Sequence, residues 1–232
     1  MREAPLTNRS KTGPAEKQTA LEERGRQGAR LFSPSTARNR DPICAVFLEY
    51  MPTAGTILEI GSGTGEHAVH LAASLPNVRW LPGDPDQASR ASIAAWIETS
   101  GLDNVAAPHA IDVTVASWAG EVASPVAGVV SINMIHIAPF DAARGLIAGA
   151  GALLGPGGKL FLYGPFSRAG HHTAPSNAEF DKSLKERDPR WGVRDLEHEV
   201  APIARDAGLV LEKAVEMPAN NFSVIFKKSP GR

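Results

Sequence analysis

A glycine-rich loop, residues 59–65, is the segment of this sequence best suited to hold a nucleotide. It follows a short apolar run, residues 56–60, and precedes a helical pattern. Gly61, Gly63 and Gly65 allow a sharp turn and let the backbone approach a ligand, while the helix presents free N–H groups. The pattern predicts a ligand site at a strand–loop–helix junction.

The spacing of the glycines in the loop indicates which ligand it binds. A dinucleotide-binding loop has the pattern G-x-G-x-x-G, but Glu66 stands where its third glycine belongs and would repel a pyrophosphate. S-adenosylmethionine (SAM) has no phosphate, and its cationic groups tolerate carboxylates such as Glu59 and Glu66. The loop therefore favours SAM over a nicotinamide cofactor. The predicted contacts are Glu59, Gly61, Ser62, Gly63, Gly65 and His67.

Two aspartates follow later apolar runs. Asp84, nineteen residues after Gly65, can accept both ribose hydroxyls, although an aspartate here could instead cap the next helix. We assign that cap to Asp86. Asp112 and Val113 offer a carboxylate for the adenine amine and an apolar wall for its ring; the alternative for Asp112 is an ordinary turn residue.

Candidates for the chemical step lie after another apolar run, residues 128–132. Asn133 ends the run, and its amide could face the cofactor or the acceptor. His136 is the candidate general base by residue type and place. The alternatives are a histidine hydrogen-bonded in the core or a loop, and an asparagine amide with a buried partner.

An insertion, residues 164–195, is longer than ordinary connections and predicts a lid that lines the acceptor pocket. Arginines and an aromatic residue near its end could clamp an anionic acceptor: Arg187, Trp191 and Arg194. The alternative is an internal network of these arginines with Asp188 and Asp195. His171 and His172 lack a third ligand at suitable spacing, so we predict no metal site.

Apolar runs alternate with helical patterns after an opening helix at residues 35–50, which predicts a parallel sheet with right-handed crossovers. Residues 210–215 and 222–227 are joined too closely to hold a helix and predict an antiparallel hairpin. The expected fold is α/β: a doubly wound, seven-stranded, mostly parallel sheet with a C-terminal antiparallel hairpin. The seven runs are residues 56–60, 78–81, 105–111, 128–132, 159–163, 210–215 and 222–227.

The 232 residues suit one domain, which we place at residues 30–232, after a disordered extension at residues 1–29 that is poor in apolar side chains. The extension lacks the features of a targeting peptide. A net charge of −1 argues against nucleic-acid binding, and no apolar run reaches the length of a membrane helix. With Cys44 as the single cysteine, we expect a soluble, cytoplasmic protein.

These motifs resemble the class I SAM-dependent methyltransferase superfamily over about residues 35–228. The glycine loop matches its first motif, Asp84 its acidic motif, residues 112–113 its adenine motif, and residues 154–158 the motif before its fifth strand. The resemblance implies a Rossmann-like methyltransferase fold with SAM as cofactor.

Four further segments resemble the narrower methyltransferase-like 26 family: residues 131–140, 180–184, 187–195 and 217–221. That family has an Arg-Asn pair before the first helix, matched by Arg38 and Asn39, which the resemblance implies as cofactor contacts. One departure is Pro202, which falls inside the helix expected over residues 195–207 and would kink it.

The sequence thus predicts a SAM-dependent methyltransferase that acts on a small-molecule acceptor by in-line displacement. The alternative is a SAM-fold protein that binds cofactor or a partner without transferring methyl. The acceptor, the attacked atom and the oligomeric state do not follow from the sequence.

Overall fold

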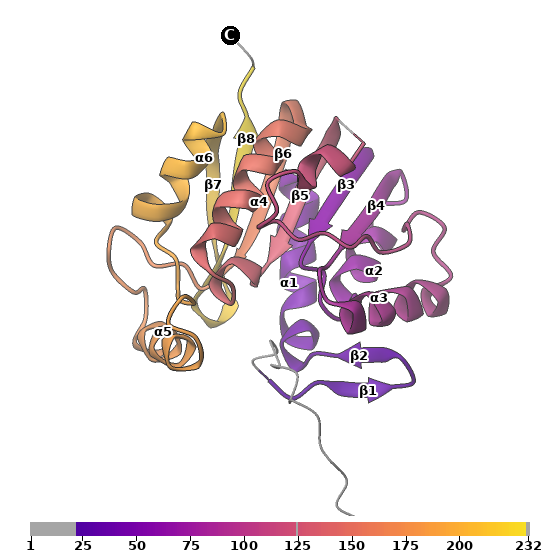
Figure 1. Ribbon diagram of the computed structural model, residues 1–232, viewed down its shortest axis with the longest axis horizontal. Helices are drawn as coiled ribbons and strands as arrows, with labels where there is room; N and C mark the ends of the chain where they lie inside the picture. The colour runs from indigo at the N-terminus through magenta and orange to yellow at the C-terminus, as the bar shows by residue number, and fades with distance from the viewer. Residues whose placement is uncertain (1–21, 124, 231–232) are drawn as a thin grey trace, which may run out of the picture.

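The computed structural model describes residues 22–123 and 125–230, and its centre is one mixed sheet (Figure 1). Six strands lie in the order β4-β3-β5-β6-β8-β7. β3 to β6 run parallel, whereas β8 is antiparallel to both β6 and β7. The α/β class and the C-terminal hairpin are confirmed. The bounds are Gly55–Ile60 (β3), Val78–Gly83 (β4), Val126–Ile132 (β5), Leu154–Gly164 (β6), Leu209–Met217 (β7) and Asn221–Lys228 (β8).

The prediction of seven strands is wrong, because residues 105–111 do not form a regular strand. The segment runs beside β4 through two isolated parallel bridges, Trp80 with Val105 and Gly83 with His109. Pro108 lies just before the second bridge and has no N–H to donate, so the ladder is interrupted.

Helices cover both faces of the sheet (Figure 1). The first three helices pack on one face, over a core that includes Phe47, Leu71 and Trp80. α4 and α6 pack on the other face, over a core that includes Leu146 and Ala204. Because both faces are covered, the central strands are apolar almost throughout. The helices are α1 (Pro34–Tyr50), α2 (Glu66–Ala73), α3 (Gln87–Ser100), α4 (Phe140–Leu153), α5 (Pro175–Arg187) and α6 (Ala201–Asp206).

The carboxyl ends of the parallel strands bring the predicted site residues to one edge. The glycine loop follows β3, Asp84 follows β4, Asn133 begins the short turn η2 (Met134–His136) after β5, and residues 164–195 follow β6. Ligands bind at this edge in open α/β sheets. The topology therefore supports one site rather than several.

The predicted disordered extension, residues 1–29, lies mostly outside the described residues, but its described end is ordered. There β1 (Gly25–Gln27) pairs antiparallel with β2 (Arg30–Phe32) in the hairpin at the bottom of Figure 1. The ring of Phe32 packs edge-on against Trp96 of α3, with centroids 5.0 Å apart. Ordered structure therefore begins before residue 30.

The helix expected over residues 195–207 is present, and it is irregular next to Pro202. The π-helical turn η3 (Leu196–Val200) precedes α6, and Pro202 lies in the first turn of α6. The backbone stays helical from η3 into α6, and Pro202 has no N–H to bond to the preceding turn, so the irregularity there agrees with the expected effect of proline.

Glycines of α4 allow its close packing, and we expect Gly149→Ala to lower the free energy of unfolding by about 2 kcal/mol. A Cβ at this position would lie 2.0 Å from Cζ2 of the buried Trp118 ring. Urea denaturation measures the loss, with Gly120→Ala as the control because nothing lies within 4 Å of a Cβ there. Equal stability of the two variants would contradict this packing.

Candidate functional site

The glycine loop requires glycine at three positions. Gly61, Gly63 and Gly65 have φ angles of 72, 57 and 89°, in the left-handed region that other residues disfavour. Space is also short, since a Cβ on Gly65 would lie 2.8 Å from Cα of Ile93, and one on Gly61 2.8 Å from Cγ of Met134. The loop therefore packs against α3 and against the turn after β5.

Hydrogen bonds pin this loop to the end of β4. The N–H groups of Gly61 and Ser62 both donate to the carbonyl oxygen of Gly83, at 2.8 and 3.1 Å. The N–H of Gly83 donates in return to Oγ of Ser62 at 3.2 Å. These bonds fix the loop against the residue that precedes Asp84.

Asp84 is buried beside the loop and accepts backbone N–H groups with both carboxylate oxygens. Oδ2 accepts from Gly63 and Oδ1 from Asp86, each at 2.9 Å. Burial raises the pKa of Asp84, although these hydrogen bonds lower it. Asp86 caps α3 through a 2.7 Å bond from the N–H of Ser89, which agrees with the predicted division of roles.

Glu59 lies at the base of the loop and is 2% exposed. Its Oε2 accepts a hydrogen bond of 3.0 Å from Nε1 of Trp80 on β4. Burial raises its pKa to about 7, against hydrogen bonds from Trp80 and Ser62 that lower it. Glu59 therefore joins β3 to β4 beneath the loop.

Glu66 ties the N-terminal segment to the loop. Its Oε2 accepts from the N–H of Ser33, the N-cap of α1, at 2.7 Å and from Oγ1 of Thr64 at 2.9 Å. In the same segment, Nη2 of Arg24 lies 3.8 Å from where a Cβ on Gly63 would stand, and its charge lowers the pKa of Asp84. The segment before α1 thus reaches the predicted ribose position.

The predicted Arg38 and Asn39 take different places. Arg38 is exposed and lies 3.6 Å from the carboxylate of Glu22. Asn39 is half-buried, and its Oδ1 lies 2.9 Å from Nε2 of His67. Burial lowers the pKa of His67 to about 3, so its ring is neutral. Asn39 and His67 are brought together, whereas Arg38 faces the N-terminal segment.

Asp112 and Val113 follow the irregular edge segment. Oδ1 of Asp112 accepts from the N–H of Thr114 at 2.9 Å and from its Oγ1 at 2.7 Å. Val113 is buried in the core. Through these bonds Asp112 stabilises a turn, which was the alternative to adenine recognition. Its other carboxylate oxygen takes no part in them.

Asn133 has a strained backbone at the site. Its φ of 63° is unusual for a residue other than glycine, and such strain often marks functional positions. The N–H of Asn133 donates to the carbonyl of Tyr163 at 2.8 Å. The next residue, Met134, packs on Gly61, so Asn133 lies beside the glycine loop.

His136, the predicted general base, is buried in the core, and its role as a base stays a prediction. His136 is 1% exposed, and its Nδ1 accepts from the N–H of Arg194 at 3.2 Å. Its ring packs on Phe166 with centroids 4.8 Å apart. Burial lowers the pKa of His136 to about 3. The bond to Nδ1 matches the alternative, a hydrogen-bonded core histidine, whereas Nε2 is buried without a partner among the described residues.

Arg194 holds the lid to the segment after β5 through its guanidinium. Its Nε donates to the carbonyl of Ile135 at 3.0 Å, and its Nη2 to those of Ala138 and Arg190 at 2.7 and 2.9 Å. These bonds use Nε and Nη2 of the five-donor guanidinium, and the role of Arg194 as an anion clamp stays a prediction. Of the other predicted lid contacts, Arg187 is exposed at the end of α5 and Trp191 is half-buried.

The family of the chain follows from a match over most of its length. Residues 30–228 match the family model described as "Protein of unknown function (DUF938)". The chain belongs to the DUF938 family.

The DUF938 chain also shares its fold with solved methyltransferase structures. An O-methyltransferase family protein from Burkholderia thailandensis is 19% identical, with a TM-score of 0.72 over 85% of this chain and 58% of its own. The S-adenosylmethionine-dependent methyltransferase SibL is 18% identical, with a TM-score of 0.67 over 85% and 56%. An O-methyltransferase family 2 protein from Planctomyces limnophilus, solved with apigenin, is 19% identical, with a TM-score of 0.68 over 84% and 60%.

These similarities establish the Rossmann-like methyltransferase fold for the DUF938 chain. The chain spans less than two thirds of the length of each of the three neighbours. Among the described residues, no helix is long and apolar enough to cross a membrane, and no group of three metal-ligating side chains gathers.

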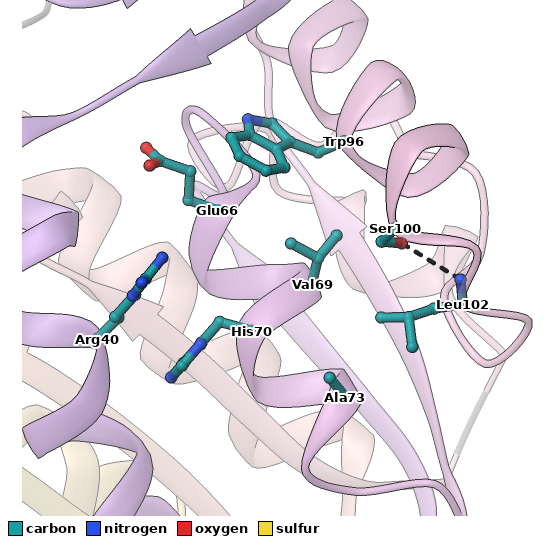
Figure 2. Close-up of a pocket in the computed structure, with 8 residues that line it drawn as sticks. All are labelled: Arg40, Glu66, Val69, His70, Ala73, Trp96, Ser100 and Leu102. Atoms are coloured by element: carbon teal, nitrogen blue, oxygen red, sulfur yellow. Dashed lines mark hydrogen bonds between the residues drawn. The ribbon is translucent and has the colours of Figure 1, made fainter.

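A groove of about 170 Å³ lies behind the glycine loop, between α1, α2 and α3 (Figure 2). Its floor is apolar, with Val69 and Leu102, while Arg40 and His70 stand on one side and Trp96 on the other. Neither the loop glycines nor Asp84 line it. The groove is therefore separate from the predicted cofactor position.

Some residues near the site were missed by the sequence reasoning. Arg24 was assigned to a disordered extension, and Ser92 carries no motif, although its Oγ accepts from the N–H of Leu31 and donates to the carbonyl of Thr64. Tyr163 ends β6 and hydrogen-bonds Asn39. Only its position at a strand end could have indicated it.

The buried Glu59 predicts a specific dependence of stability on pH. Its pKa of about 7 in the folded state exceeds the usual 4.5, so folding favours the protonated form. The free energy of unfolding that Glu59 contributes therefore falls as pH rises from 4.5 through 7, by about 3 kcal/mol. In urea titrations between pH 5 and 8, Glu59→Gln should gain stability relative to the wild type as pH rises.

The exposed Glu98→Gln serves as the matched control and should show no such trend. The comparison of variants cancels the opposite contribution of the neutral histidines, whose lowered pKa values destabilise the fold as pH falls. A pH-independent difference for Glu59→Gln would refute a raised pKa.

Proposed function

We propose that the chain is a SAM-dependent methyltransferase that acts on a small-molecule acceptor. The observation that carries the proposal is the hydrogen bond from the N–H of Gly63 to Asp84. It joins a loop of glycines with left-handed backbone angles to a buried carboxylate at the carboxyl edge of the sheet. The shared fold of the SAM-dependent neighbours supports it. The narrower resemblance to the methyltransferase-like 26 family belongs to the same proposal.

The residues of this edge fit SAM better than a dinucleotide. Each carboxylate oxygen of Asp84 accepts one backbone N–H, which leaves lone pairs for ribose hydroxyls. Glu66 lies in the first turn of α2, at the position where a dinucleotide-binding loop has its third glycine, and a carboxylate near this helix end disfavours a pyrophosphate. A ligand without phosphates is therefore favoured.

When bound, SAM supplies a methyl group already activated by its sulfonium. The chain has to hold the two reactants in line and exclude water. We assign cofactor contacts to the glycine loop and Asp84, and orientation of the cofactor or acceptor to the amide of Asn133. Because His136 is committed to the core, acceptors that attack without a dedicated base, such as carboxylates and thiolates, are favoured.

The second candidate function is cofactor or partner binding without methyl transfer, which the buried position of His136 also favours. Labelled SAM with a metabolite extract distinguishes the two. A methylated product that is lost in Asn133→Ala supports transfer, whereas SAM binding without any product supports the alternative.

The compartment we propose for this protein is the cytoplasm.

We expect Asp84→Asn to weaken binding of SAM and of S-adenosylhomocysteine at least about 10-fold in calorimetric titration. An amide at this position loses an acceptor for ribose and turns an N–H group toward a backbone donor. The exposed Asp103→Asn, measured alongside, should bind like the wild type. If the folded wild type binds neither ligand, the proposed function is wrong.

A further inference from the structure

Three polar side chains from separate elements meet beneath α1. Oδ1 of Asn39 on α1 lies 2.9 Å from Nε2 of His67 on α2, and Asn39 also hydrogen-bonds the hydroxyl of Tyr163 at the end of β6. Tyr163 is 3% exposed and His67 is buried. Polar groups are costly to bury unless each is satisfied, so the direction of these bonds matters.

The chemistry of the three groups fixes that direction. Oδ1 of Asn39 can only accept, so the neutral ring of His67 donates to it from Nε2. The amide of Asn39 then has only N–H groups left for Tyr163, and the phenol oxygen accepts. Consistent with this direction, the bond from Asn39 lowers the pKa of Tyr163, although burial raises it more. The phenol proton is left to donate elsewhere.

Tyr163 links the glycine loop and Asn133, the two parts of the proposed site. Its carbonyl accepts the N–H of Asn133, and His67 lies two residues after Gly65 of the loop. On the neighbouring strand, Ser223 is directly opposite Tyr163, and its Oγ is buried without a partner among the described residues. A buried hydroxyl without a partner, on the same face of the sheet as Tyr163, indicates that a polar group binds nearby.

We propose that the hydroxyl of Tyr163 is a ligand-contacting donor of this site, aimed by Asn39 and His67 as positioning residues, and that it binds an oxygen atom of the bound ligand. The inference rests on the proposed function. Tyr163 stays protonated near neutral pH, so it acts as a donor and not as a base. A carboxylate oxygen suits such a donor best, and it can belong to the amino-acid part of the cofactor or to the acceptor.

Tyrosine occurs only twice in the sequence, so Tyr50→Phe is a matched control for Tyr163→Phe. Calorimetric titration of each variant with S-adenosylhomocysteine and with 5′-methylthioadenosine, which lacks the amino-acid part, gives the first readout. We expect Tyr163→Phe to bind S-adenosylhomocysteine about 10-fold more weakly and methylthioadenosine unchanged. Tyr50→Phe should alter neither affinity.

The other outcomes separate the sources of the oxygen. Equal losses for both ligands assign it to the adenosine part, and unchanged binding with about 10-fold slower transfer from labelled SAM assigns it to the acceptor. Unchanged binding and transfer would overturn the proposal. If the wild type binds neither ligand, the proposed function itself fails, which is a distinct result.

Nuclear magnetic resonance of protein labelled with ¹³C at tyrosine Cζ tests the ligand contact without depending on the folding of Tyr163→Phe. Two signals are expected, and Tyr50→Phe assigns them. Saturating S-adenosylhomocysteine should move the Tyr163 signal alone, and Asn39→Ala should move it without ligand because the bond to the phenol oxygen is lost. A signal that responds to neither change would show that Tyr163 lacks both the ligand contact and the relay.

Discussion

The carbonyl oxygen of Gly83 is the junction on which the site depends. It accepts the N–H groups of Gly61 and Ser62, and so it holds the glycine loop against the strand that ends at Asp84. A Cβ at Gly83 would lie 2.8 Å from Cδ1 of Ile111 and 3.3 Å from the carbonyl oxygen of Glu59, so the junction is closely packed. With the loop fixed there, the N–H of Gly63 points at a carboxylate of Asp84. Cofactor recognition, as proposed, is thus a consequence of how two parallel strands end.

Burial sets the protonation states around this junction. It raises the pKa values of Glu59 and Asp84 and lowers those of His67 and His136. Each shift favours the uncharged form, because a low-dielectric surrounding penalises charge. The acidic side chains at this edge are held by backbone and side-chain hydrogen bonds, so the proposed part of the chain in the reaction is mainly to align two partners.

The lid is held by the residues that sequence reasoning assigned to chemistry. Arg194 donates to two backbone carbonyls of the segment after β5 and to one of the lid itself, and its own N–H donates to His136. Removing either side chain would leave buried polar groups without partners, which is a structural reason for this pairing. The N-terminal segment is held similarly by Glu66, so the elements flanking the edge are anchored to the strands and to the loop.

The sequence by itself determined the alternation of strands and helices, the terminal hairpin and the glycine loop, because these rest on local periodicity and on the conformational freedom of glycine. It also separated Asp84 from the helix cap at Asp86. Only the tertiary structure decided that His136 is core, since burial depends on residues distant in the chain. The same holds for the meeting of Asn39, His67 and Tyr163, which belong to three elements and become neighbours only when the helices pack on the sheet.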